Sequence, residues 1–165
     1  MKFYLVDKIE RIEPGKRIVA IKNLTMAEEY LADHFPAFPV MPGVMMLEAL
    51  VQTAAWLVRL EQKWSRSLIT LAAARNIRYG NFVAPGHTLR MEAELLGIEG
   101  DTARFKAAGT TGEGATAVTG RLELRCFNVA DFFPPAADAD AKIIAKLQQR
   151  FRLVGGPEAL AVAGA

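Results

Sequence analysis

The chain has 165 residues, of which 52% are hydrophobic and 23% are charged, and its net charge is +2. This composition is typical of a globular protein and excludes an intrinsically disordered one. The length fits one domain with room for an appended segment. Basic residues are scattered, without an arginine-rich run or zinc-finger spacing, so nucleic acid is not an expected partner.

Cysteine content and hydropathy bear on where the protein resides. Cys126 is the only cysteine, so no intramolecular disulfide can form. This fits the reducing cytoplasm, which we expect, although a secreted protein without disulfides would look the same. Residues 39–60 are apolar enough to resemble a membrane span, but Glu48, Gln52 and Arg59 interrupt them. Because charges inside a span are costly, we expect a buried helix and no membrane span.

The first part of the chain predicts one long helix after a short extended region. Residues 3–6 are interpreted as a short strand or an extended lead-in, and residues 17–24 as a strand after the Pro14-Gly15 turn. Residues 26–31 favour one or two helical turns. The long helix is expected at 43–60, because Pro42 is suited to the start of a helix.

Strands and turns follow the helix. Residues 88–95 alternate between apolar and polar side chains, which is typical of a strand with one buried face. The expected strands are 67–74, extended by 76–82, then 88–95, 102–110 and 115–127, with turns at 97–101 and 111–114. The last three strands predict an antiparallel meander.

The composition changes after residue 127. We therefore divide the chain into a domain at 1–127 and a C-terminal extension at 128–165. The extension predicts a helix at about 136–152, followed by a loose tail. One buried helix among antiparallel strands indicates an α+β domain with the sheet curled around the helix. Such a sheet leaves part of the helix uncovered, which a partner subunit could cover.

The candidate chemistry is concentrated in one string. His34 begins a proline-rich loop that ends at Pro42-Gly43, and Glu48 lies in the apolar helix that follows. Neutral imidazole can accept a proton near pH 7, and a carboxylate in apolar surroundings can keep a proton to donate. Gln52 lies four residues after Glu48 and therefore on the same helix face. His34 could instead be structural or exposed, and the face with Glu48 could simply reach solvent.

The start of the helix adds a third candidate group. Backbone N–H groups there are unpaired and can stabilise a carbonyl oxygen that gains negative charge, and Gly43 lets a ligand approach closely. Gly43 could equally be an ordinary turn glycine. His87 follows a Pro-Gly turn and is interpreted as a surface residue. With one cysteine and two distant histidines, no metal site is expected.

At these residues the sequence resembles a known family. The string His34-Phe35-Pro36-x-x-Pro39-Val40-Met41-Pro42-Gly43, followed by Leu47-Glu48-Ala49-Leu50-x-Gln52, resembles the hot-dog-fold 3-hydroxyacyl-[acyl carrier protein] dehydratases of the FabZ type. The resemblance extends from about residue 3 to residue 127. It implies an antiparallel sheet wrapped around a long central helix. It also implies a homodimer or a trimer of dimers, with active sites at the subunit interface.

The resemblance assigns a role to each candidate residue. His34 matches the catalytic histidine, and Glu48, supplied by the other subunit, matches the catalytic acid. Gly43 matches the backbone N–H that binds the thioester carbonyl, the carbonyl of Val40 orients the imidazole, and Gln52 supports Glu48. The implied reaction converts 3-hydroxyacyl thioesters on acyl carrier protein into trans-2-enoyl thioesters, in fatty-acid or related biosynthesis, without a cofactor. The sister FabA type, which also isomerises, has aspartate at the position of Glu48, so plain dehydration is favoured.

Two other functions remain open. One is a hot-dog acyl thioesterase, in which Glu48 would act as a base toward water. The other is a non-catalytic acyl-binding subunit of a lipid or polyketide pathway. Arg75, Arg78 and Arg90, or the lysines of the extension, are candidates for receiving an acidic carrier protein. Alanine at position 37 replaces a family glycine, which would cost about 1 kcal/mol or more if that position needs a positive φ.

Overall fold

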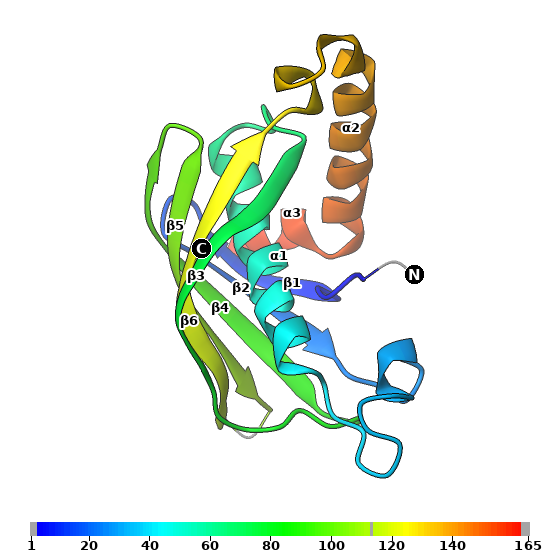
Figure 1. Ribbon diagram of the computed structural model, residues 1–165. Helices are drawn as coiled ribbons and strands as arrows, with labels where there is room; N and C mark the ends of the chain where they lie inside the picture. Colours follow the sequence, from blue (N-terminus) through cyan, green and yellow to red (C-terminus); the bar gives the residue numbers. More distant parts are fainter. Residues whose placement is uncertain (1–2, 113, 163–165) are drawn as a thin grey trace.

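The computed structural model describes residues 3–112 and 114–162, and one antiparallel sheet curved around a long helix dominates it (Figure 1). The helix is α1 (Gly43–Glu61). The strands are β1 (Lys8–Glu13), β2 (Arg17–Asn23), β3 (Leu68–Tyr79), β4 (Thr88–Glu99), β5 (Thr102–Thr111) and β6 (Thr116–Phe127). Their order across the sheet is β1-β2-β4-β5-β6-β3. The predicted α+β class, with a sheet around a central helix, is confirmed.

Helix α1 forms the centre of the core. It begins directly after Pro42, whose carbonyl accepts hydrogen bonds from the N–H groups of Met45 and Met46. Its residues Leu50, Ala54 and Leu57 are fully buried. The concave face of the sheet packs against this helix (Figure 1). By length and composition α1 could cross a membrane, but more than half of that stretch is buried inside the molecule. This burial favours the interpretation of α1 as a core helix.

The predicted meander is present as β4, β5 and β6, which pair in sequence order. The turn predicted at 97–101 begins later than expected. Strand β4 continues to Glu99, and Gly100 and Asp101 form the turn. A bulge between Leu95 and Gly97 shifts the register of β4, which ends the apolar–polar alternation before the strand itself ends. Gly100 has a φ of 57°, which explains the glycine there.

Strand β1 was not predicted, and the strand considered at residues 3–6 is not formed. The apolar residues of β1, Ile9 and Ile12, are three apart and do not fit the two-residue period of a strand. A bulge between Ile9 and Arg11 inserts one extra residue, so both isoleucines face the core and are buried. Residues 3–6 instead run alongside α1 as an extended segment without a strand partner.

The two stretches predicted at 67–74 and 76–82 are one strand, β3, which ends earlier, at Tyr79. Two register shifts interrupt its pairing with β6, and Asn76 has a φ of 54° at the second of them. Strand β3 lies at the end of the strand order, so within the described sheet its other edge is unpaired. Leu71 and Tyr79 on this strand are exposed.

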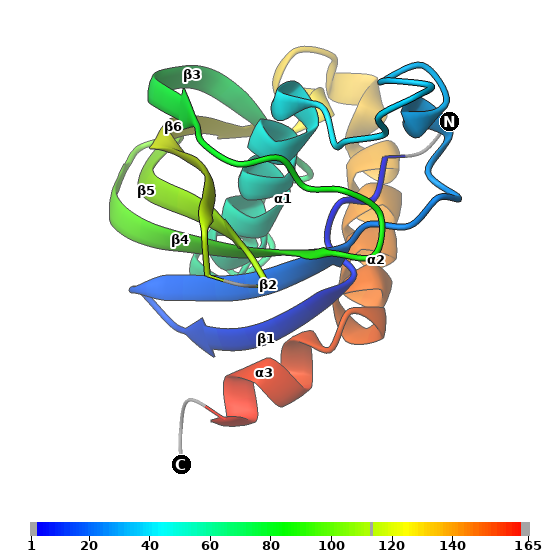
Figure 2. The ribbon, with the colours of Figure 1, turned by 90° about the horizontal axis from the view of Figure 1, so that it is seen from below.

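The C-terminal extension packs onto the side of α1 that the sheet leaves open, as Figures 1 and 2 both show. Helix α2 (Ala137–Leu153) lies where a helix was expected at about 136–152. A second helix, α3 (Gly156–Val162), occupies part of the tail that was expected to be loose, and residues 163–165 lie outside the described part. Phe151 is buried against Trp56 and Trp64, with ring centroids 5.8 and 5.5 Å away. Such contacts join the extension to the core. The division of the chain at residue 127 stays a prediction.

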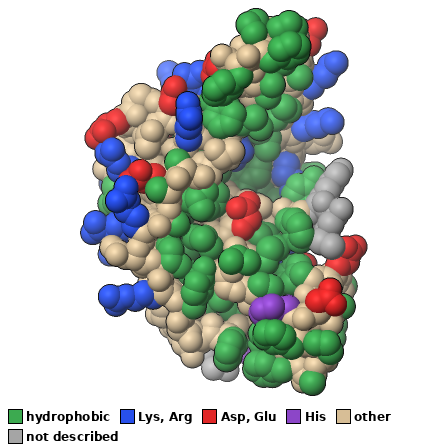
Figure 3. Space-filling model, in the orientation of Figure 1, with side chains coloured by type: hydrophobic (Ala, Val, Ile, Leu, Met, Phe, Trp, Pro, Cys, Tyr) green, Lys and Arg blue, Asp and Glu red, His purple; other side chains and the backbone are tan. Residues whose placement is uncertain are grey.

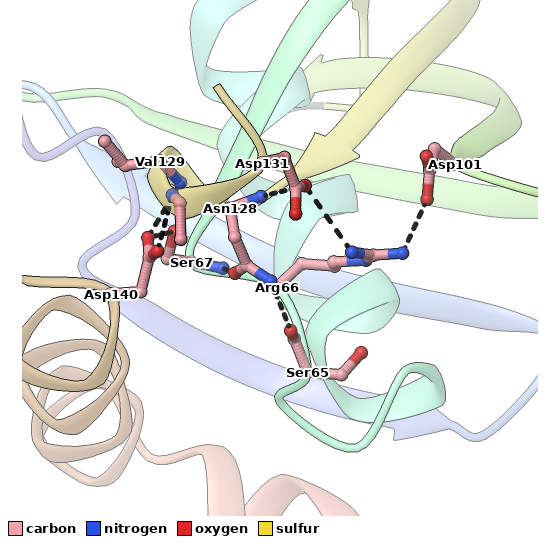
Figure 4. A network of polar contacts seen from close by, with 9 residues as sticks. Ser65, Arg66, Ser67, Asp101, Asn128, Val129, Asp131 and Asp140 are labelled. Atoms are coloured by element: carbon pink, nitrogen blue, oxygen red, sulfur yellow. Dashed lines mark hydrogen bonds and ion pairs between the residues drawn. The ribbon is translucent and has the colours of Figure 1, made fainter. Parts of the chain in front are cut away.

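A polar network fixes the start of α2 to the sheet (Figure 4). The buried carboxylate of Asp140 accepts hydrogen bonds from the Ser67 hydroxyl and from the N–H groups of Val129 and Ala130, the latter two at 2.9 Å. Burial alone would raise the pKa of Asp140, but these hydrogen bonds hold it below its ordinary value of 3.8. The charged carboxylate therefore stabilises the folded state at neutral pH, and this contribution is lost as the pH falls below about 4.

Replacing Asp140 with asparagine should lower the stability of the protein at pH 7, because an amide cannot accept all three hydrogen bonds. We expect a fall of several degrees in Tm, measured by thermal unfolding with circular dichroism. The difference from the parent protein should shrink as the pH falls below about 4, where the parent carboxylate also becomes protonated. Asp138→Asn is the matched control, because Asp138 is exposed on the same helix. Equal effects of the two substitutions would contradict this role of Asp140.

Candidate active site

His34 lies in a compact loop between a short 3-10 helix (Glu29–Leu31) and α1. The loop closes on itself: the N–H of Val40 donates to the carbonyl of His34, and Phe35 and Phe38 exchange backbone hydrogen bonds. The Nδ1 atom of His34 lies 3.0 Å from the carbonyl oxygen of Val40. A carbonyl can only accept, so Nδ1 carries the proton and Nε2 is left as an acceptor. This loop therefore presents a half-buried imidazole that can take up a proton.

Ala37 does not strain this loop. The non-glycine residues with positive φ in the described chain are Lys63, Trp64 and Asn76. Ala37 is not among them, so the positive φ that would make alanine costly at this position is absent. Three prolines and the paired backbone groups of the loop hold its shape.

Gly43 and His34 line the same cavity, which has a volume of about 230 Å³. Gly43 is the first residue of α1, where the backbone N–H groups have no partner within the helix. A Cβ atom at this position would lie 3.1 Å from the ring of Tyr79, which also lines the cavity. The glycine thus allows the end of β3 to approach the start of the helix. A negatively charged oxygen in this cavity would find both an N–H donor and the imidazole nearby.

Glu48 is held by Gln52, as its position four residues away predicts. The side-chain amide of Gln52 donates to Oε1 of Glu48 and to the carbonyl of Phe3, both at 3.0 Å. Its oxygen accepts the N–H of Leu5, also at 3.0 Å. The extended segment at residues 3–6 thereby fixes the Gln52 amide, which in turn orients the half-buried carboxylate.

Within one chain the candidate residues are divided between two cavities. His34, Val40 and Gly43 line the first, whereas Glu48 and Gln52 line a second cavity of about 260 Å³ beside α2. Glu48 lies in the second turn of α1, and His34 precedes the start of that helix. The structure thus brings together the members of each set and does not join the two sets in one pocket. His87 is exposed, as predicted, and lies in neither cavity.

Sequence reasoning missed several residues of these cavities. Tyr79 lines the His34 cavity from the end of β3, and Phe82 lines it from the loop that follows. The Phe82 ring packs edge-on against Phe38, with ring centroids 5.6 Å apart. Tyr4 lines the Glu48 cavity from the N-terminal segment. No local signal marks such residues, because they reach these cavities through contacts between segments that are far apart in the chain. Within residues 3–112 and 114–162, no group of three histidine, cysteine or acidic residues is arranged to hold a metal ion.

Comparison with known proteins places this geometry in a family. A FabA-like domain matches residues 1–119, which is most of the chain. The chain belongs to the FabA-like family. It is 41% identical over 123 residues to the 3-hydroxyacyl-[acyl-carrier-protein] dehydratase FabZ of Acetivibrio thermocellus, covering 73% of this chain and 82% of that protein. The FabZ of Exiguobacterium sibiricum is 41% identical over 120 residues, with coverage of 73% and 85%.

Solved structures show the same fold for this FabA-like protein. The dehydratase heterocomplex ApeI:P of Xenorhabdus doucetiae superposes with a TM-score of 0.65 at 18% identity, covering 81% of this chain and 90% of that one. The PaaI protein of Escherichia coli superposes with a TM-score of 0.55 at 13% identity, with coverage of 73% and 78%. At such low identity these matches establish the fold alone, and the expected hot-dog fold is confirmed.

Proposed function

We propose that this FabA-like protein dehydrates 3-hydroxyacyl thioesters carried on acyl carrier protein to trans-2-enoyl thioesters, in fatty-acid or related acyl-chain biosynthesis. The observation that carries the proposal is the imidazole of His34, whose Nδ1 is held by the Val40 carbonyl in a cavity shared with the Gly43 backbone. The identity to proteins named as FabZ dehydratases supports it. The lone Cys126 fits a cytoplasmic location.

The proposed reaction begins at the carbon next to the thioester. Nε2 of His34 removes a proton from C2, and the electrons of that C–H bond form the C2–C3 double bond. Negative charge that develops on the thioester oxygen is stabilised by the N–H of Gly43 and by the positive end of α1. The Val40 carbonyl also stabilises the imidazolium that forms, because it accepts a hydrogen bond from Nδ1.

The second half of the reaction removes the hydroxyl group from C3. A protonated Glu48 donates its proton to the departing oxygen, so the C3–O bond breaks and water leaves. The proton taken by His34 then balances the proton lost by Glu48 when both groups return to their starting states. No oxidant, reductant or cofactor is required by this balance.

We further propose that each site is completed by two copies of the chain. Support comes from the separation of His34 and Glu48 into different cavities of one protomer. The unpaired edge of β3, with exposed Leu71 and Tyr79, is a surface on which a second copy could pair. A homodimer, or a trimer of dimers, would place Glu48 of one copy opposite His34 of the other.

A direct assay tests the proposed reaction. The purified protein is incubated with a 3-hydroxyacyl thioester and, separately, with a saturated acyl thioester of the same length. We expect enoyl product, followed by its absorbance, from the first and no free thiol from the second. Release of thiol from the saturated substrate, without enoyl product from the hydroxylated one, would instead indicate a thioesterase.

Gln52→Met should lower kcat by about tenfold with little change in KM, because the Gln52 amide stabilises the carboxylate that forms as Glu48 gives up its proton. A hydrogen bond to a charged group contributes on the order of 1.5–3 kcal/mol. The substitution keeps the side-chain volume but removes the contacts to Glu48, Phe3 and Leu5. Steady-state kinetics measures the effect, and a shifted pH–rate profile would distinguish a positioning role from a merely structural one. Gln149→Met, on the exposed face of α2, is the control. A Gln52→Met enzyme with unchanged kcat would contradict the role assigned to Gln52.

A further inference from the structure

The proposed chemistry uses Glu48 but not the apolar walls of the cavity beside it. This cavity lies between α1, the N-terminal segment and α2, and its walls include Val51, Trp56, Ile69 and Leu147. In Figure 3 the surface is hollowed below α2, and hydrophobic side chains surround the hollow. These walls are suited to an acyl chain. Leu147 belongs to the C-terminal extension, which therefore contributes one wall.

The cavity follows one face of α1 from Glu48 toward the end of the helix. Glu48, Gln52 and Arg59 all line it. Eleven residues separate Glu48 from Arg59, which corresponds to about 16 Å along the helix axis. A chain bound with its C3 hydroxyl near Glu48 and its far end along α1 would run toward Arg59.

Two arginines line the cavity, and each stacks on an aromatic ring. The guanidinium of Arg59 lies 5.1 Å from the centroid of Trp56, and that of Arg150, from α2, lies 3.9 Å from the centroid of Tyr4. Stacking occupies the face of a guanidinium and leaves its N–H donors, which point outward in the plane, free to bind an anion.

Neither arginine has an anionic partner within the described chain. No described carboxylate forms an ion pair with Arg59 or Arg150. The Nε atom of Arg59 is buried and has no hydrogen-bond acceptor among the described residues. Burial lowers the pKa of Arg59 to about 10, which still leaves it charged at neutral pH. Buried cations are ordinarily paired, so the empty donors mark a place for an anion.

The geometry points to a substrate class: 3-hydroxyacyl thioesters whose far end carries a carboxylate, bound by Arg59 and Arg150, which line the Glu48 cavity. This inference rests on the proposed function, because it takes Glu48 as the position of the reacting end. A carboxylate matches the paired N–H donors of a guanidinium, whereas a terminal methyl group would leave them unpaired. The C-terminal extension then serves to supply Leu147 and Arg150 to the substrate pocket.

The test compares two synthetic 3-hydroxyacyl pantetheine thioesters of equal length, one ending in a methyl group and the other in a carboxylate. Over a series of lengths, the parent protein should prefer the carboxylate-ended substrate by at least about tenfold in kcat/KM. Arg150→Leu should lower kcat/KM for that substrate by about 10–100-fold, and it should not lower kcat/KM for the methyl-ended one. Arg150→Lys should retain part of the preference, because it keeps the charge but loses the planar donors.

Arg152→Leu is the matched control, because Arg152 is exposed on the same helix and does not line this cavity. Circular dichroism verifies that each variant is folded. Equal use of the two substrates by the parent protein would overturn the inference. So would an equal loss for both substrates in Arg150→Leu.

A binding experiment separates this inference from the proposed reaction. Saturated thioesters with the same two ends carry no hydroxyl group to eliminate, and calorimetry measures their affinity for the parent protein and for Arg150→Leu. If neither hydroxylated substrate is dehydrated, the proposed function fails. Tighter binding of the carboxylate-ended probe by the parent protein, lost in Arg150→Leu, would still support a carboxylate site at the two arginines. Equal binding of both probes by the parent protein would refute that site.

Discussion

Replacing His34 with alanine should lower kcat/KM for dehydration by about 10²–10⁴-fold, the contribution expected of one general base. Among the described residues that line this cavity, the imidazole is the side chain suited to act as a base, and its other nitrogen is held by a carbonyl. Steady-state kinetics with a 3-hydroxyacyl thioester measures the loss. The fold should survive, because the side chain is half-buried and its single hydrogen bond is local.

His87→Ala is the control for this experiment, because His87 is exposed and lies outside the His34 cavity. Its kcat/KM should equal that of the parent protein. Full activity in the His34→Ala protein would remove His34 from the mechanism and, with it, the main support for the proposed reaction.

The second large effect is expected for Glu48→Gln, which should also lower kcat/KM by about 10²–10⁴-fold, because an amide cannot donate an acidic proton to the leaving oxygen. The substitution preserves the shape of the side chain and its contact with Gln52. If the site combines His34 of one copy with Glu48 of another, the two inactive variants should complement each other.

The complementation experiment mixes the His34→Ala and Glu48→Gln chains in equal amounts under conditions that exchange subunits. Random pairing makes half of the dimers mixed, and each mixed dimer regains one of its two sites, so about a quarter of the parent activity should return. Each variant mixed with itself provides the background. A mixture that stays inactive after verified subunit exchange would place both residues in sites formed by a single chain.

Contacts within α1 and in the loop before it show what a local pattern can predict. Gln52 contacts Glu48 as the four-residue spacing indicates, and α1 begins after Pro42 as the Pro-Gly pair indicates. The contact between His34 and the Val40 carbonyl is also local, since six residues separate them. Such features depend on backbone and side-chain preferences that act within a few residues.

Long-range packing decided the features that were missed. The bulge that turns Ile9 and Ile12 into the core depends on pairing with β2, and the bulge at Leu95 depends on pairing with β5. Likewise, Tyr79 at the end of β3 lies beside Gly43 at the start of α1, although the two residues are far apart in the chain. No pattern within a short window reports contacts of this kind.

Local patterns in the chain predict the α+β class, the central helix, the meander and the group of candidate residues around His34 and Glu48, because periodicity and proline chemistry act locally. How those residues are divided between cavities depends on tertiary packing. It placed His34 and Gly43 in one cavity and Glu48 in another, and it set Arg150 of the C-terminal extension beside the second. These arrangements result from burying α1 between a curved sheet and α2, and such packing joins residues that are far apart in the chain.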